Sequence, residues 1–232
     1  MYKMKIIKLI ILFALTTQVL SNDGIWTGIF DINGHGKYDF TGLISDQMAT
    51  AYTEKAKVVY KGKIRTYKNK FKWNLSMYLK DGNKFGTAEI TGKIIDGNIM
   101  SGKWVTEPAK DYGNIYLIKD KSNAASGVKK IINKSWVSIE NKILHTLIIK
   151  DFLISGKDSN NCNYYGKLQI LNEEIYGIDF DIASCGISDG TYSGMAYVDK
   201  KNNLVINAIS NNFSLFLKLK YTIFFEIYKL LQ

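Results

Sequence analysis

Both cysteines of the 232-residue chain lie in one short stretch, NCNYYGKLQILNEEIYGIDFDIASCG, and they are its only thiol groups. Cys162 and Cys185 flank the polar run 172–175, which separates two segments of alternating apolar and polar residues. An antiparallel hairpin centred between Glu173 and Glu174 places the cysteines opposite each other, at a distance that a disulfide can bridge. We therefore predict a disulfide between Cys162 and Cys185, and two buried free thiols are the alternative.

The apolar residues of this stretch favour a pairing that differs by one residue. They place Leu168 opposite Phe180, so that the apolar faces of both strands point to the same side. One extra residue between this pair and the cysteines reconciles the two registers. We expect this β-bulge near Gly166, because glycine tolerates the irregular backbone of a bulge.

Histidine, which hydrolases and metal sites usually require, is scarce. The chain has only His35, between two glycines, and His145, within the strand-like run ILHTLII. It contains no HExxH, GxSxG, GxGxxG or GxxxxGK[ST] motif, and a disulfide would remove both thiols as metal ligands. We therefore assign no catalytic residue, no metal ligand and no cofactor, and we expect that the protein is not an enzyme.

Asp179 and Asp181 are the most suggestive pair of carboxylates. Two carboxylates on one strand face are able to serve glycoside hydrolysis or calcium binding. Strict alternation in GIDFDIA explains the pair more simply as the solvent face of a half-buried strand. We therefore expect both side chains to face water.

A basic run is the strongest charge feature of the chain. Between residues 55 and 72 there are eight Lys and Arg residues and no acidic residue. We predict a candidate anion-binding face made of Lys61, Lys63, Arg65, Lys70 and Lys72. Its partner would be an anionic envelope polymer or another envelope protein. The alternative is a solvated face that resists edge-to-edge aggregation.

The same run predicts a hairpin whose apolar faces agree. A turn at Tyr67-Lys68 pairs Ile64 with Phe71 and places Gly62 opposite Trp73, where an indole can cover a bare glycine. In this register Lys63 faces Lys72 and Arg65 faces Lys70. The expected inward-facing residues are Val58, Tyr60, Gly62, Ile64, Phe71, Trp73, Leu75, Met77 and Leu79.

Residues 1–21 are typical of an export signal, with an uncleaved N-terminal anchor as the alternative. Lys3, Lys5 and Lys8 precede an apolar run that is too short to span a bilayer comfortably. Their removal lowers the net charge from +10 to +7. We predict a periplasmic or extracellular protein with no transmembrane helix in the mature chain, and export argues against nucleic acid as a partner.

Alternating residues and turn signals predict an all-β protein of two antiparallel modules. Residues 22–120 form an up-and-down barrel or curled sheet, and residues 135–220 form a second module that carries the cysteine hairpin. A polar linker, 121–134, joins them, and an apolar tail covers 221–232. Expected strands are 25–31, 37–45, 48–54, 57–67, 70–80, 84–95, 98–105, 113–119, then 135–140, 143–154, 163–171, 175–184, 191–199, 203–209 and 213–220, with turns at Asn33-Gly34, Asp81-Gly82 and Asp96-Gly97.

Two resemblances add to this interpretation. Gly24-Ile25-Trp26 at the start of the first strand resembles the GxW opening of lipocalins, which implies a barrel that carries a ligand. The segments GIWTGIF, YDFTGLISDQMATAYTEKAKVVYKG, MYLKDG, CNYYGKLQI, IYGIDFDIASCG, DGTYSGMAYVD and LVINAISN resemble a group of uncharacterised exported proteobacterial proteins. The second resemblance implies export, all-β structure and pairing of the two cysteines, and it provides no activity or site residues.

Three functional hypotheses follow. The leading one is a non-enzymatic exported envelope protein that works by binding or interaction. The alternative is a lipocalin-like barrel carrying a small apolar ligand, which an unfilled interior near Trp26, Trp73 and Trp104 would favour. A cleft that gathers His35 or His145 with carboxylates would instead favour an enzyme.

Overall fold

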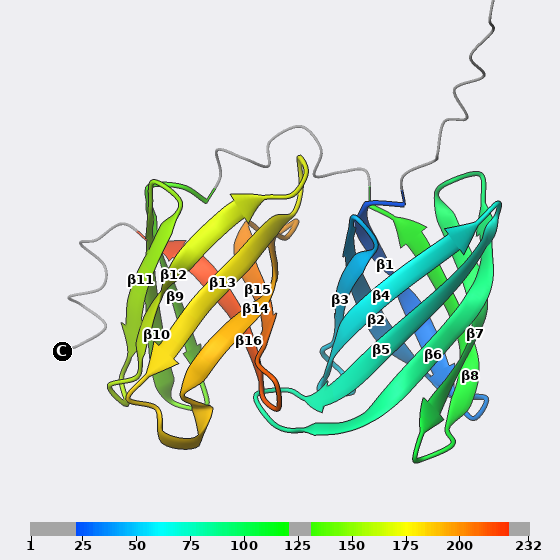
Figure 1. Ribbon diagram of the computed structural model, residues 1–232, viewed down its shortest axis with the longest axis horizontal. Helices are drawn as coiled ribbons and strands as arrows, with labels where there is room; N and C mark the ends of the chain where they lie inside the picture. Colours follow the sequence, from blue (N-terminus) through cyan, green and yellow to red (C-terminus); the bar gives the residue numbers. More distant parts are fainter. Residues whose placement is uncertain (1–21, 121–130, 223–232) are drawn as a thin grey trace, which may run out of the picture.

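The chain folds into two closed antiparallel β-barrels that lie side by side (Figure 1). The structure is a computed structural model, and it describes residues 22–120 and 131–222. The predicted signal peptide, most of the predicted linker and all but two residues of the predicted apolar tail lie outside the described residues. The all-β fold predicted from the alternating pattern is confirmed.

Barrel 1 is an eight-stranded meander in which every strand pairs with the next and β1 closes on β8. Its turns are tight where the sequence contains turn residues. Asn33 and Gly34 both have positive φ, 52° and 77°, as the predicted two-residue hairpin turn requires. The strands are β1 Gly24–Ile32, β2 His35–Ser45, β3 Met48–Thr53, β4 Val58–Tyr67, β5 Lys70–Leu79, β6 Lys84–Ile95, β7 Ile99–Glu107 and β8 Tyr112–Lys119.

Barrel 2 repeats this topology, with β9 closing the barrel between β10 and β16. It has eight strands rather than the predicted seven, because the expected strand 143–154 is two strands joined at Asp151-Phe152. Both turn residues have positive φ, 49° and 67°, and phenylalanine is not a typical turn residue. The strands are β9 Lys134–Glu140, β10 Ile143–Lys150, β11 Leu153–Asp158, β12 Asn163–Ile170, β13 Tyr176–Ala183, β14 Gly190–Val198, β15 Asn203–Ile209 and β16 Ser214–Thr222.

The β4–β5 hairpin keeps its predicted faces but shifts in register by two residues. Ile64 pairs with Trp73, and Gly62 pairs with Leu75. The turn lies one residue later than predicted, and a shift by two residues leaves every side chain on the same face. The predicted inward residues join the core of barrel 1, except Gly62, which is half-buried, and Leu79, which is exposed. The Trp73 indole covers Gly42 of β2 instead of Gly62.

The cysteine hairpin also has a register that differs from the prediction. Leu168 pairs with Ile178, and the regular β12–β13 ladder runs through Gly166 without a bulge. The extra residue is Ser184, which has a φ of 65° just beyond the end of β13. The predicted bulge position was therefore wrong. A five-residue loop between Ile170 and Tyr176, longer than expected, sets the observed register.

The two barrels meet through an apolar interface. Side chains on the outer faces of both barrels form one buried cluster: Ile25, Leu43, Tyr52, Val59 and Tyr78 of barrel 1, with Ile175, Met195, Tyr197, Val205, Ile209 and Phe216 of barrel 2. At its centre the Tyr52 and Tyr197 hydroxyls are hydrogen-bonded at 2.7 Å, and Asn207 Nδ2 donates to the Ala51 carbonyl at 2.9 Å. Burying this apolar surface stabilises the docked arrangement.

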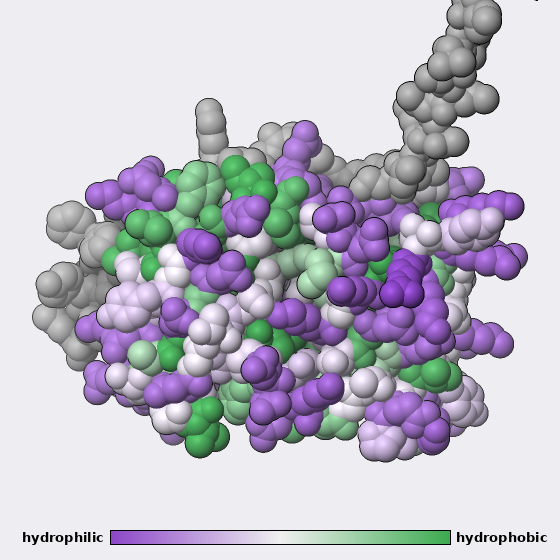
Figure 2. Space-filling model, viewed as in Figure 1, coloured by the Kyte–Doolittle hydropathy of each residue, from purple (hydrophilic) through white to green (hydrophobic). Residues whose placement is uncertain are grey.

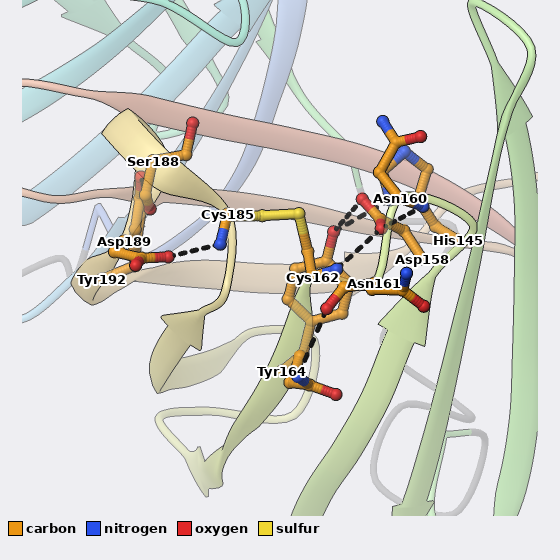
Figure 3. The surroundings of a disulfide bond; sticks show 11 residues. His145, Asp158, Asn160, Asn161, Cys162, Tyr164, Cys185, Ser188, Asp189 and Tyr192 are labelled. Carbon is orange, nitrogen blue, oxygen red and sulfur yellow. Dashed lines mark hydrogen bonds between the residues drawn. A yellow bond between two sulfur atoms is a disulfide. The ribbon is translucent and has the colours of Figure 1, made fainter.

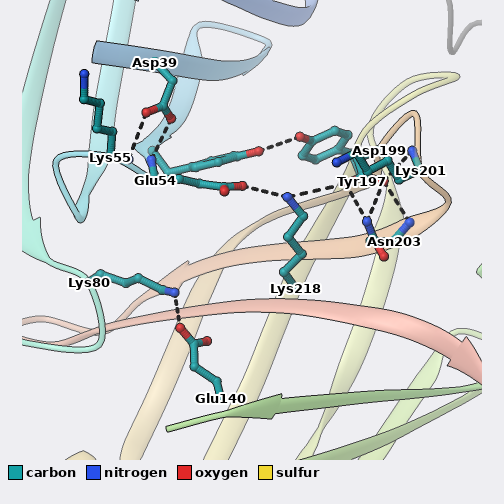
Figure 4. Close-up of polar contacts among 11 residues, drawn as sticks. Asp39, Glu54, Lys55, Lys80, Glu140, Tyr197, Asp199, Lys201, Asn203 and Lys218 are labelled. Atoms are coloured by element: carbon teal, nitrogen blue, oxygen red, sulfur yellow. Dashed lines mark hydrogen bonds and ion pairs between the residues drawn. The ribbon is translucent and has the colours of Figure 1, made fainter. Parts of the chain in front are cut away.

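Two ion pairs join the barrels along one edge of this interface (Figure 4). Lys218 of β16 pairs with Glu54 at 2.7 Å, and Lys80 pairs with Glu140 of β9. These contacts are partly exposed and each contributes little to the free energy of folding. They orient the two barrels around the apolar centre.

Candidate functional site

The interior of barrel 1 is packed at one end and hollow at the other. Trp26 and Trp73 are 0% exposed and fill the packed end together with Met100 and Leu117. The other end holds a cavity of about 210 Å³. Its wall is mostly apolar and includes Phe30, Phe40, Tyr60, Met77, Trp104 and Ile115.

Local packing explains why this end is not filled. Phe30 packs edge-on against Trp104, with ring centroids 5.4 Å apart, and edge-on against Phe40 at 6.3 Å. These large rings therefore stabilise one another along the cavity wall. Elsewhere the wall includes Ala56 and Ala88, whose short side chains leave the centre of this end open.

The mouth of the cavity is held by loops that are hydrogen-bonded to each other. The Asn33 backbone NH donates to the Tyr112 carbonyl at 2.7 Å, and Asn33 Nδ2 donates to Asp111 Oδ1 at 3.0 Å. The β3–β4 loop is fixed in a similar way, since Asp39 accepts from the backbone NH groups of Glu54 and Lys55. These bonds preorganise the mouth, which reduces the ordering cost of binding.

Few polar groups reach this cavity. Burial raises the pKa of Tyr60, so its hydroxyl stays neutral. The Thr106 hydroxyl accepts a hydrogen bond from the Asp111 backbone NH at 3.1 Å, which engages it with the loop. An interior of this kind can hold an apolar body, and Asp111 is the one carboxyl group among the described residues that line it.

An unfilled interior near Trp26, Trp73 and Trp104 was the condition that would favour a ligand-carrying barrel, and one of these three tryptophans borders the cavity. Trp104 lines the cavity, whereas Trp26 and Trp73 lie in the packed end. Sequence reasoning missed Phe30, Phe40 and Ala88. The available signal was the run of small residues, Gly86 and Ala88, at inward positions of β6 before the bulky Ile90.

The predicted basic face is divided between two surroundings. Lys63, Arg65, Lys70 and Lys72 are exposed on β4 and β5. Lys61 instead reaches barrel 2, where its Nζ donates to the Ser193 carbonyl at 3.1 Å and to Ser193 Oγ at 2.8 Å. Burial lowers the pKa of Lys61. It therefore serves the contact between the barrels.

Acidic residues reduce the positive charge of this face. Lys72 pairs with Glu89 at 2.8 Å, and Arg65 lies opposite Lys72 in the register, where Lys70 had been predicted. A shallow hollow of about 610 Å³ contains Lys63 and Arg65 together with Glu89 and Glu107. The structure thus brings together cations and carboxylates rather than cations alone.

On the side shown in Figure 2, hydrophilic residues predominate and apolar residues form small groups.

The predicted disulfide between Cys162 and Cys185 is confirmed. It lies at one end of barrel 2, beside a hydrogen-bonded chain of polar side chains (Figure 3). Tyr164 Oη donates to Asp158 Oδ2 at 3.2 Å, and His145 Nδ1 lies 3.1 Å from Tyr164 Oη. Asp158 and the two sulfur atoms are close together, but bridged sulfurs are not thiolate ligands.

The remaining residues considered from the sequence are far less enclosed. His35 is exposed at the start of β2. Asp179 and Asp181 are exposed on β13, as the alternating pattern predicted, and Asp181 accepts a hydrogen bond from the Thr191 hydroxyl at 2.6 Å. No helix within residues 22–120 and 131–222 has both the length and the apolarity needed to cross a bilayer.

Comparisons of the chain with protein-family models, with curated proteins and with solved structures found no match.

Proposed function

We propose that the protein is an exported binding protein whose barrel 1 holds a small apolar molecule. The observation that carries this proposal is the cavity of about 210 Å³ at the open end of barrel 1, walled by aromatic and aliphatic side chains. A hollow of this kind leaves dispersion contacts unmade, and an apolar ligand would restore them. The proposal also agrees with the GxW resemblance of β1.

The volume limits the ligand. An apolar cavity of roughly 150 Å³ in another protein stays dry and binds benzene. The cavity in barrel 1, at about 210 Å³, suits a fused two-ring molecule or a short alkyl chain. A porphyrin macrocycle is much larger than this, so we propose a small apolar compound rather than a tetrapyrrole.

Export is supported by the disulfide and by the N-terminal sequence. Disulfides persist in oxidising compartments and are rare in the cytosol. Cys162 and Cys185 are paired, and residues 1–21 have the charge and hydrophobicity of an export signal. We therefore place the working protein in the periplasm or outside the cell.

Binding of an anionic envelope polymer by the basic face is less well supported. Of the five predicted residues, Lys61 is engaged with Ser193 and Lys72 with Glu89. Lys63 and Arg65 share a hollow with Glu89 and Glu107. No described side chain fills the cavity of barrel 1, whereas Lys61 and Lys72 of the basic face already have partners within the protein. For this reason the cavity is our leading site.

Plugging the mouth of barrel 1 tests the proposal. Ala56 lines the cavity from the β3–β4 loop, so Ala56→Trp should fill the mouth while leaving the packed end around Trp26 unchanged. We expect 2-naphthol to bind the wild type in isothermal titration calorimetry. Binding should weaken by at least about tenfold in the variant, which corresponds to about 1.4 kcal/mol.

The matched control is Ala183→Trp, which adds the same side chain to an exposed position on barrel 2. This variant should bind 2-naphthol as the wild type does. Equal binding by Ala56→Trp and the wild type, or no binding by the wild type, would contradict the proposal.

A further inference from the structure

Barrel 2 contains a second cavity, of about 270 Å³, at the end that carries the disulfide. Its lining differs from that of the cavity in barrel 1. Three carboxylates, Asp81, Glu140 and Asp158, line it together with the aromatic rings of Tyr164, Tyr192, Phe213 and Phe216. No Lys or Arg is among the described residues that line it, although Lys and Arg outnumber Asp and Glu by 31 to 21 in the whole chain.

The wall of barrel 2 is incomplete beside this cavity. Among the described residues, β9 pairs with β16 at Ser135, Trp136 and Val137, and residues 138–140 have no partner on β16. We call this gap between β9 and β16 the seam. The β5–β6 loop of barrel 1 lies against it. The Phe216 backbone NH donates to Asp81 Oδ1 at 2.9 Å, and Lys80 pairs with Glu140. The seam is therefore lined by carboxylates from both barrels.

An ammonium group already lies at the edge of this seam. Lys80 Nζ is held by Glu140 and lies 4.9 Å from the centroid of the Phe216 ring. A carboxylate together with the face of an aromatic ring is a combination that attracts organic cations. Glu140 and the Phe216 ring thus already hold one ammonium group at this edge of the cavity.

The directions of the hydrogen bonds inside the cavity also favour a ligand that donates hydrogen bonds. The Tyr164 hydroxyl has a single hydrogen, which it donates to Asp158, so His145 Nδ1 must donate to Tyr164. Burial lowers the pKa of His145, which keeps the ring neutral, and Nε2 is then an acceptor. His145 is only 9% exposed, and Nε2 has no partner among the described residues.

We infer that the cavity of barrel 2 binds a small organic cation, such as a primary amine attached to an aromatic or alkyl body. The acceptors Asp81, Glu140 and His145 Nε2 would receive the ammonium hydrogens. The rings of Tyr192 and Phe213 and the side chain of Leu217 would contact the body of the ligand. This site is separate from the cavity of barrel 1 and does not depend on the function proposed for it.

The arrangement favours binding over catalysis, although it gathers His145 with carboxylates. The two sulfur atoms are bridged, and Tyr164 is the hydroxyl that contacts His145. Its hydrogen is donated to Asp158, and burial beside Asp158 raises its pKa, so it is not an activated nucleophile.

Calorimetry on the full chain tests this inference with phenethylamine, with 2-phenylethanol as its uncharged analogue. We expect phenethylamine to bind at pH 7.5 and 2-phenylethanol to bind at least about tenfold more weakly. Asp81→Asn and Glu140→Gln should each weaken phenethylamine binding by about tenfold. The Asn side chain still accepts from the Phe216 NH and suits the positive φ of 54° at this position.

Asp179→Asn is the matched control, because it removes a carboxylate from the exposed face of β13. It should bind phenethylamine as the wild type does. Equal binding of the alcohol and the amine would overturn the inference, as would wild-type affinity in both cavity variants. Far-ultraviolet circular dichroism provides an independent check that each variant is folded.

A pH series sharpens the test. Burial raises the pKa of Asp81 to about 6. The groups that face Asp81 are Lys80, Glu140, Tyr164 and Tyr192, and His145 and Asp158 line the same cavity. Because the pKa of Asp81 is about 6, this carboxyl group loses its proton between pH 5 and pH 7, and phenethylamine stays positively charged throughout. The affinity for phenethylamine should therefore rise over this pH range. This rise should be smaller in Asp81→Asn; an unchanged profile in the variant would contradict the role of Asp81.

Discussion

Replacing Gly28 with valine is expected to prevent barrel 1 from closing. Gly28 lies on β1, where β1 pairs with β8. A Cβ atom at this position would lie 2.0 Å from the Tyr116 carbonyl oxygen and 2.8 Å from Leu117 Cα. Both contacts are with the backbone of β8, so neither can be relieved by moving a side chain, and β1 must shift away from β8.

We expect Gly28→Val to lower the free energy of unfolding by at least about 3 kcal/mol, the upper part of the range for overpacked positions. Urea denaturation followed by tryptophan fluorescence measures this loss, because three of the four tryptophans lie in barrel 1. Thr27→Val, one residue earlier on the same strand, should change stability by less than about 0.5 kcal/mol. A Gly28→Val variant as stable as the wild type would show that β1 and β8 do not approach as described.

Removing the disulfide is expected to have a similarly large effect, located in barrel 2. The bridge joins residues 23 positions apart, and closing a loop of this length restricts the unfolded chain. In the chain-entropy model the restriction contributes about 3 kcal/mol. We therefore expect Cys162→Ala with Cys185→Ala to lose about 3 kcal/mol of stability, measured as the shift of the urea midpoint followed by circular dichroism.

A reducing agent provides the control for this experiment. It should destabilise the wild type to the level of the double variant and leave the double variant unchanged. A wild type that reducing agent does not affect, or one in which mass spectrometry finds both sulfurs reduced after export, would contradict the assigned bridge.

The architecture was predictable because its signals are local. Alternation along β4 and β5 identified the inward faces, and Asn33-Gly34 identified a hairpin turn, since glycine and asparagine adopt positive φ at low cost. The two registers were harder to predict. A two-residue shift preserves both faces of a strand, so the apolar pattern cannot distinguish Ile64 opposite Trp73 from Ile64 opposite Phe71.

The sites depend on contacts that the sequence pattern does not contain. The hollow in barrel 1 exists because Phe30 and Trp104 pack against each other along the wall, which depends on how the barrel curves. The cavity in barrel 2 includes Asp81, which is a turn residue of barrel 1 in the sequence. Its place beside Phe216 follows from the docking of the two barrels, because Asp81 and Phe216 are 135 positions apart in the sequence.

The most direct test of the proposed function is a crystal structure of the protein with 1-bromonaphthalene. Bromine is located by its anomalous scattering, independently of the interpretation of the surrounding density. The account predicts a bromine peak inside barrel 1, in contact with Trp104 or Met77, which line the cavity. A cavity occupied by ordered water, with bromine absent or only at the outer surface, would contradict it.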